Sequence, residues 1–199
     1  MANQNKQRTQ QVALGAILTA LVAVLQFLGA FIRFGTFSVS LVLIPIVIGA
    51  ALCGWKVGAW LGLVFGVTVL LSGDASLFLA VSVPGTVGTV LIKGIACGAA
   101  AGAVYKLFER RGRYLAVVIS AIVCPVVNTG VFLIGCAIFF MDTLAGWSQA
   151  LGFGTDVVRY ILFGLVGGNF LLELGTNILL SPIIVRIIDA AAKSKKVTE

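Results

Sequence analysis

The chain has 199 residues, of which 60% are hydrophobic and 11% are charged, and its mean hydropathy is +1.12. Because soluble domains carry about a quarter charged residues, this composition excludes a water-soluble globular protein and places the chain in a bilayer. The formal net charge of +7 does not indicate nucleic-acid binding, since the basic residues flank apolar runs without interleaved aromatic residues.

Apolar runs long enough to cross a hydrocarbon core of about 30 Å occur six times along the chain. We expect one all-α integral membrane domain over residues 1–199, with six transmembrane helices in one bundle. The expected helices span residues 10–32, 38–54, 57–72, 84–106, 115–140 and 157–187. A barrel is not expected, because the runs do not alternate polar and apolar residues. Pro45 and Pro125 fall inside the second and fifth expected helices and predict kinks there.

The distribution of basic residues predicts the orientation. With the N-terminus inside, all but three of the 14 Lys and Arg residues fall on one side of the membrane, and cytoplasmic segments are enriched in these residues. The exceptions are Arg33, Lys93 and Arg159. Both termini are therefore predicted to be cytoplasmic.

Small residues recur every four positions in the third and fourth expected helices, which places them along one face of each helix. This pattern favours close packing between helices in a membrane. The residues are Gly54, Gly58, Gly62 and Gly66, followed by Gly94, Gly98 and Gly102. On the first helix, Ala16 and Ala20 belong to a weaker small-residue face, where internal packing and docking of a membrane partner both stay open.

Lys93 interrupts the apolar run of the fourth expected helix. Counted from Pro84, it lies about 13 to 14 Å deep, near the middle of the hydrocarbon core. An ionisable group at this depth is costly unless it has a partner or water, so Lys93 is expected to face the interior. Thr89, one helical turn before Lys93, lies on the same face.

The sixth expected helix spaces Asn169, Glu173 and Asn177 four residues apart, and Asn128 lies halfway along the fifth. One interpretation is a buried ion pair between Lys93 and Glu173, with amide hydrogen bonds, that holds the helices together. The other is a polar ligand pocket. Buried ion pairs stabilise less than apolar packing does, which favours the pocket.

In such a pocket, Lys93 would bind a carboxylate or phosphate, and the asparagines would bind amides and hydroxyls. Glu173 would either neutralise Lys93 or accept from ligand hydroxyls. Arg33, expected at the outer surface, could guide an anionic group, while Phe78 and Phe132 are candidates for apolar walls. The candidate substrate-binding residues are Lys93, Asn128, Asn169, Glu173, Thr89, Arg33, Phe78 and Phe132.

The sequence lacks residues that several kinds of chemistry require. The sequence has no histidine, no phosphate-binding loop of the GxxxxGK[ST] type and no paired carboxylates within a span. The four cysteines fall in apolar runs without metal-ligand spacing. We therefore expect no enzyme activity, no cofactor and no metal ion, and any transport would need energy from another subunit.

Nearly the whole chain resembles the substrate-binding S component of energy-coupling factor transporters. The resemblance rests on the Ala16-x-x-x-Ala20 pattern and on the series FGTFSVSLVLIPIVIGAALCGWKVGAWLGLVFG followed by GTVLIKGIACGAAAGAVYKLFERRGR. It implies a high-affinity capture subunit for a vitamin or related micronutrient. It also implies association with a membrane T component that carries two cytoplasmic ATPases, in the plasma membrane of a prokaryote.

The resemblance further implies that Ala16 and Ala20 dock on the T component. The pocket would open outward, lined by the fourth to sixth helices and covered by the loops around Arg33–Ser38 and Gly73–Val83. A lysine with amides fits a small, polar, anionic vitamin such as pantothenate, while riboflavin, folate and other micronutrients stay open. Two other classes also remain: a self-sufficient small permease or channel, and a structural or assembly membrane protein.

Overall fold

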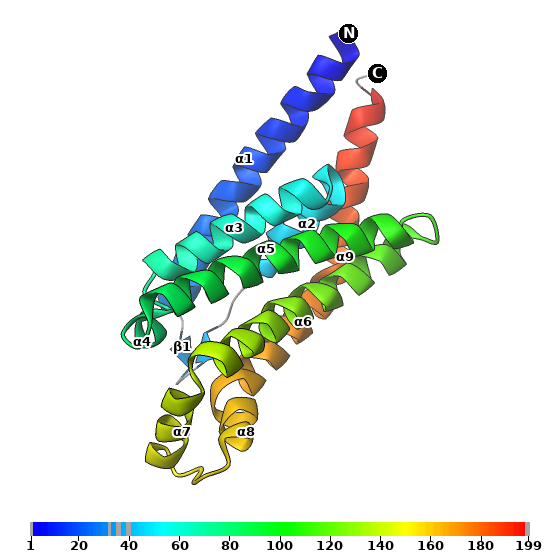
Figure 1. Cartoon of the computed structure of the whole chain (residues 1–199). Coiled ribbons are helices and arrows are strands. Elements are labelled where there is room, and N and C mark those ends of the chain that lie inside the picture. Colours follow the sequence, from blue (N-terminus) through cyan, green and yellow to red (C-terminus); the bar gives the residue numbers. More distant parts are fainter. Residues whose placement is uncertain (1, 32, 35–36, 39–40, 198–199) are drawn as a thin grey trace.

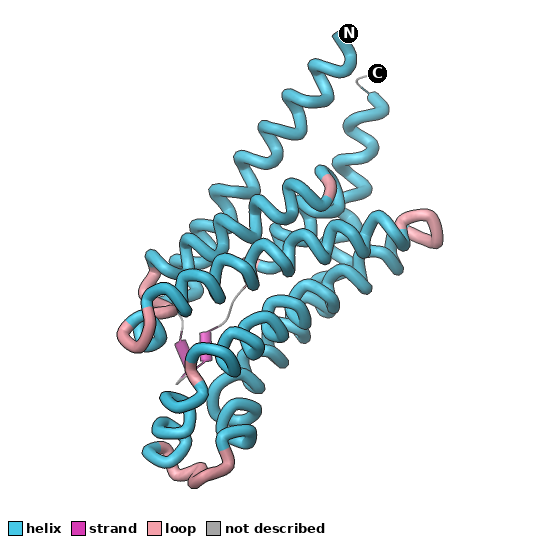
Figure 2. Tube along the Cα trace, viewed as in Figure 1, coloured by secondary structure: helices cyan, strands magenta, loops and turns pink. Residues whose placement is uncertain are grey.

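The computed structural model describes the backbone of residues 2–31, 33–34, 37–38 and 41–197, and the side chains of residues 9–30 and 41–190. Helices make up nearly all of the trace (Figure 2). In chain order the elements are α1 (Ala2–Phe31), β1 (Arg33–Phe34), β2 (Phe37–Ser38), α2 (Leu43–Cys53), α3 (Trp55–Leu71), α4 (Ser76–Leu79), α5 (Val83–Phe108), α6 (Arg113–Phe139), α7 (Met141–Ala150), α8 (Val157–Arg159), the π-helix η1 (Tyr160–Val166) and α9 (Gly167–Val197).

Four helical stretches of the described chain are long and apolar enough to cross a membrane. They are Thr9–Ala30 within α1, α5, α6 and Val157–Ala190, which joins α8, η1 and α9. The expected all-α membrane protein is therefore confirmed. Six spans remain a prediction, because α2 and α3 are apolar but shorter than the other four stretches.

The two ends of the bundle differ. Both termini lie at one end, whereas α4, β1, α7 and α8 lie at the other (Figure 1). We refer to the second as the loop end of the molecule. The shared position of the termini agrees with an even number of crossings; that this end is cytoplasmic remains a prediction.

The second expected helix needs a correction at its start. It begins at Leu43 rather than at residue 38, because β1 and β2 form a short antiparallel pair in which Arg33 faces Ser38. Pro45 thus lies in the first turn of α2 and not in mid-helix. Helical N–H groups in a first turn have no intrahelical acceptor, so proline is tolerated there.

The segment between α6 and α9 also differs from expectation. It contains a further helix, α7, whose Leu144 and Ser148 are buried. The Ser148 hydroxyl donates to the carbonyl oxygen of Gly154 at 2.9 Å, and this bond fixes the turn that leads into α8. The sixth expected helix is in turn divided, since η1 separates α8 from α9.

Glycines bring α3 and α5 into direct backbone contact, as their spacing predicts. A Cβ atom added at Gly62 would overlap the carbonyl group of Gly94, and one added at Gly58 would overlap that of Gly98. A Cβ atom added at Gly94 or Gly98 would in turn overlap the carbonyl group of Gly62 or Gly58, respectively. These two helices therefore form the rigid base on which the cavity described below is built.

We expect Gly62→Ala to lower the melting temperature of the detergent-solubilised protein. The added methyl group meets backbone rather than a flexible side chain, and overpacking of this kind costs about 1–3 kcal/mol. Gly88→Ala is the matched control, since it lies in α5 with open space around its added Cβ. Equal melting temperatures for the two variants would contradict the packing argument.

Candidate binding cavity

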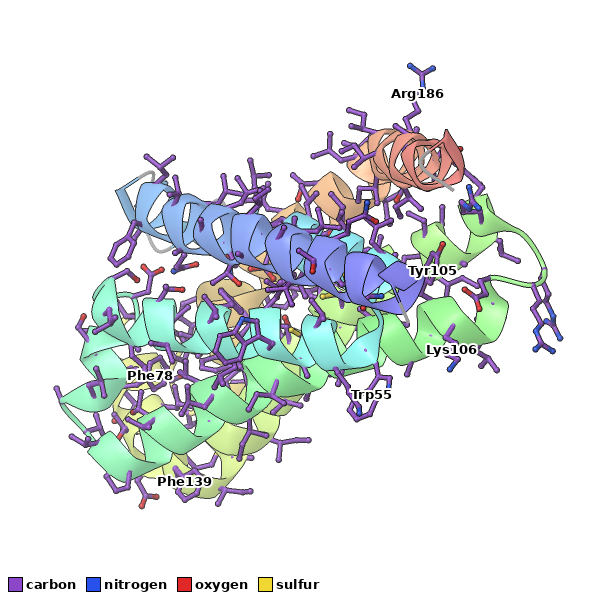
Figure 3. All side chains as sticks on the ribbon, turned by 90° about the horizontal axis from the view of Figure 1, so that it is seen from above. Trp55, Phe78, Tyr105, Lys106, Phe139 and Arg186 are labelled. Atoms are coloured by element: carbon purple, nitrogen blue, oxygen red, sulfur yellow. The ribbon has the colours of Figure 1, made fainter. Side chains whose placement is uncertain are left out.

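A cavity of about 610 Å³ lies between α1, α3, α4, α5, α6, α7, η1 and α9. Cavities of this size hold small organic molecules. Phe78, which lines the cavity, lies at the end of the molecule opposite to Trp55, Tyr105 and Lys106 (Figure 3). The cavity is therefore near the loop end and away from the termini.

The structure brings together nearly all of the residues predicted to bind substrate. Those that line the cavity are Thr89 and Lys93 of α5, Asn128 and Phe132 of α6, Asn169 and Glu173 of α9, and Phe78 of α4. Arg33 lies in β1, but its side chain is outside the described residues. The separate docking candidates, Ala16 and Ala20, are exposed on α1.

Glu173 is the centre of a buried amide–carboxylate cluster. Its side chain is 4% exposed. The amide of Asn128 donates to Glu173 Oε2 at 3.5 Å, and the amide of Asn169 donates to Glu173 Oε1 at 3.4 Å. Both contacts are longer than a typical N–H···O bond of about 2.9–3.0 Å. The first contact joins α6 to α9, the second lies within α9, and together they use both carboxylate oxygens.

Three buried oxygen atoms of the cavity residues have no hydrogen-bond partner among the described residues. These are Thr89 Oγ1, Asn128 Oδ1 and Asn169 Oδ1. An unsatisfied buried polar group costs about 1–3 kcal/mol, and such groups in native proteins call for an explanation. A ligand that supplies hydrogen-bond donors would relieve this cost.

Lys93 is half-buried between two aromatic rings. Its ammonium nitrogen lies 5.5 Å from the ring centroid of Phe65 and 5.2 Å from that of Phe132, within the range of cation–π attraction. The buried ion pair with Glu173 that one interpretation expected does not form between these two described side chains. A cation with two aromatic neighbours and no carboxylate contact is well suited to receive an anionic ligand.

Aromatic side chains form one wall of the cavity. The ring of Phe78 makes edge contacts with Phe132, Phe140 and Trp147, with centroid distances of 5.5, 5.1 and 5.5 Å. Phe78 and Phe132, the two candidates for apolar walls, thus both line the cavity and contact each other. The interpretation of the sequence missed Phe140 and Trp147, because α7 was not expected and nothing separates a wall residue from a lipid-facing one in a uniformly apolar run.

Gln26 of α1 was also missed. It is buried, lines the cavity and donates from Nε2 to Asp74 Oδ2 at 2.5 Å and to Ser72 Oγ at 3.4 Å. These bonds connect α1 to the segment between α3 and α4. An amide inside an otherwise apolar run was the available signal, since such a group in a membrane span needs a partner.

Within the described part of the chain, no three His, Cys, Asp or Glu side chains gather into a possible metal site. The arrangement is instead one for reversible binding: one cation, several unpaired oxygen atoms and an aromatic wall.

An all-α membrane bundle with a polar cavity between its helices defines a class of membrane proteins that bind a small molecule. Residues 10–185 match the family described as the substrate-specific component of ECF (energy-coupling factor) transporters, and the chain belongs to this family. It is also similar to the pantothenic acid transporter PanT of Lactococcus lactis subsp. cremoris (strain MG1363), with 29% identity over 197 residues that cover 90% of this chain and 94% of PanT. The predicted resemblance, the location in a cell membrane with several crossings and a transport role are thereby confirmed, and the family is not one of enzymes.

Proposed function

We propose that the protein is the high-affinity capture subunit of an ATP-driven importer for a small, polar, anionic vitamin, with pantothenate as the first candidate. The observation that carries the proposal is the cavity that Lys93 lines together with Thr89, Asn128 and Asn169, each of which has a buried oxygen without a partner among the described residues. The similarity to a pantothenic acid transporter supports this choice of substrate.

Pantothenate has a carboxylate at one end, an amide in the middle and a dimethyl group flanked by two hydroxyls at the other. Lys93 would bind the carboxylate through a charge-assisted hydrogen bond. Asn128, Asn169 and Thr89 would accept from hydroxyl and amide donors, and Phe78 and Phe132 would contact the methyl groups. Arg33 remains a candidate for guiding the anion toward the cavity.

Delivery of the vitamin would depend on a membrane T component and two cytoplasmic ATPases. The chain has no phosphate-binding loop of its own, so it would borrow the energy of ATP hydrolysis from these partners. Ala16 and Ala20 are the proposed docking residues, and their exposure on α1 leaves them accessible to another membrane protein.

Mass spectrometry of small molecules released from the freshly purified, denatured protein tests the proposal. A tight capture subunit should carry its ligand through purification, so we expect stoichiometric pantothenate, and less from Lys93→Ala purified in parallel. A different vitamin would correct the substrate, whereas only lipid and detergent would contradict the capture role. Uptake by the protein alone in liposomes without an ATPase would instead support a permease.

A further inference from the structure

We infer that Glu173 is a positioning residue, which fixes the amides of Asn128 and Asn169 so that these residues offer hydrogen-bond acceptors to the ligand. The inference rests on the proposed function, because it assigns a role within the same cavity. The expected role of Glu173 was either to neutralise Lys93 or to accept from ligand hydroxyls, whereas here it acts on the ligand through its neighbours.

The burial and the contacts of Glu173 support this role. Its side chain is 4% exposed, and each carboxylate oxygen accepts from a different asparagine, Oε2 from Asn128 and Oε1 from Asn169. A carboxylate accepts hydrogen bonds and donates none, so only the N–H end of each amide can turn toward it. The carboxylate thus determines which end of each amide remains for other partners.

The remaining ends are the amide oxygens. Asn128 and Asn169 both line the cavity, and the Oδ1 atom of each is buried without a hydrogen-bond partner in the described part of the protein. Each needs a donor, and a ligand in the cavity is the natural source of one. Hydroxyl or amide N–H groups of the ligand are therefore expected at the asparagines.

The same arrangement sets the direction of the ligand. Glu173 repels an anion at the asparagine side of the cavity and occupies the amide donors that an anion would need there. Lys93 carries the ammonium group, flanked by Phe65 and Phe132 and without an ion pair to Glu173. The ligand is thus expected to place its anionic end at Lys93 and its hydroxyl-bearing end at the two asparagines.

The test compares pantothenate with its analogue in which both hydroxyl groups are replaced by hydrogen. Wild-type protein should bind the dideoxy analogue at least tenfold more weakly, because the asparagine oxygens lose their donors. In Glu173→Gln, one of the two oxygens that face the asparagines becomes an amide NH₂ group, which donates and cannot accept, so the asparagine on that side must turn its own oxygen toward it. We expect pantothenate to bind at least tenfold more weakly to this variant, and the preference over the analogue to fall severalfold.

Asn177→Ala is the matched control. Asn177 lies one turn beyond Glu173 on α9, is fully buried and donates to the backbone carbonyl of Glu173 at 2.8 Å, but it does not line the cavity. Its loss should lower the melting temperature and leave the preference for pantothenate over the analogue unchanged. If Glu173 acted in folding alone, Glu173→Gln would likewise lower the melting temperature and leave the preference for pantothenate unchanged. A change in that preference therefore separates positioning from structural support.

Two outcomes would overturn the inference. Equal weakening of both ligands in Glu173→Gln would show that the carboxylate does not control hydroxyl recognition. If that variant does not fold, wild-type protein decides: equal affinity for pantothenate and the dideoxy analogue would mean that no hydroxyl is recognised at the asparagines. Failure of wild-type protein to bind either ligand would instead count against pantothenate as the substrate.

Discussion

Lys93→Ala is expected to lower the affinity for pantothenate at least tenfold, which corresponds to about 1.4 kcal/mol. Among the cavity residues whose side chains are described, Lys93 alone carries a positive charge. Its loss removes the charge-assisted hydrogen bond to the ligand carboxylate. Equilibrium binding of labelled pantothenate to purified protein in lipid nanodiscs measures the effect.

The stability of the Lys93→Ala variant, unlike its affinity for pantothenate, should increase or stay unchanged. A half-buried ammonium group in the middle of a membrane span is costly. Without ligand, Lys93→Ala is therefore expected to melt at the same temperature as the wild-type protein or at a higher one. Lys106→Ala is the control, because Lys106 is exposed on the same helix at the far end of the molecule (Figure 3). Unchanged affinity in both Lys93→Ala and Asn128→Ala would remove the binding assignment.

Helical periodicity explains how much of the cavity was predictable. Residues four apart share a face, so the sequence alone placed Asn169 and Glu173 together, and Thr89 together with Lys93. The cost of polar groups in hydrocarbon then required both faces to point inward. Distance along the chain gave their depth, and the structure indeed brings these four residues into the wall of one cavity with Asn128.

The aromatic wall was only partly predictable, because its members depend on contacts between helices. Trp147 reaches the cavity from α7, an amphipathic helix of 10 residues that is too short to register as a span. Phe140 ends an apolar run in which Phe139 is equally apolar, yet Phe140 is buried and Phe139 is exposed. Periodicity does not settle which of two adjacent residues at a helix end turns inward.

The wrong start of the second helix led in turn to the wrong interpretation of Pro45. The same residue breaks a hydrogen bond in mid-helix and is harmless in a first turn. Pro45 was interpreted in the first sense because an apolar run hides where a helix begins, whereas a short strand pair places it in the second. The pairing of β1 with β2 depends on two-residue strands, whose pattern is too short to detect in sequence.

Ala16→Trp and Ala20→Trp are each expected to abolish copurification with the T component while pantothenate binding persists. Both alanines are exposed on α1, where Ile17 is 65% exposed beside them. In the first stretch that could cross the membrane, only 17% of the apolar 18-residue window is buried inside the bundle. Small residues on such a face allow another helix to approach closely, and an indole ring in their place would hold it away.

Ligand binding should survive these substitutions, because neither alanine lines the cavity and an exposed tryptophan on α1 replaces contact with lipid only. Ala137→Trp is the matched control: it is exposed on α6, away from the predicted docking face, and should leave the complex intact. Loss of the complex in the control as well would point to a general effect of added bulk. Intact complexes in both α1 variants would show instead that the T component binds elsewhere, because close helix packing cannot accommodate a tryptophan at the contact.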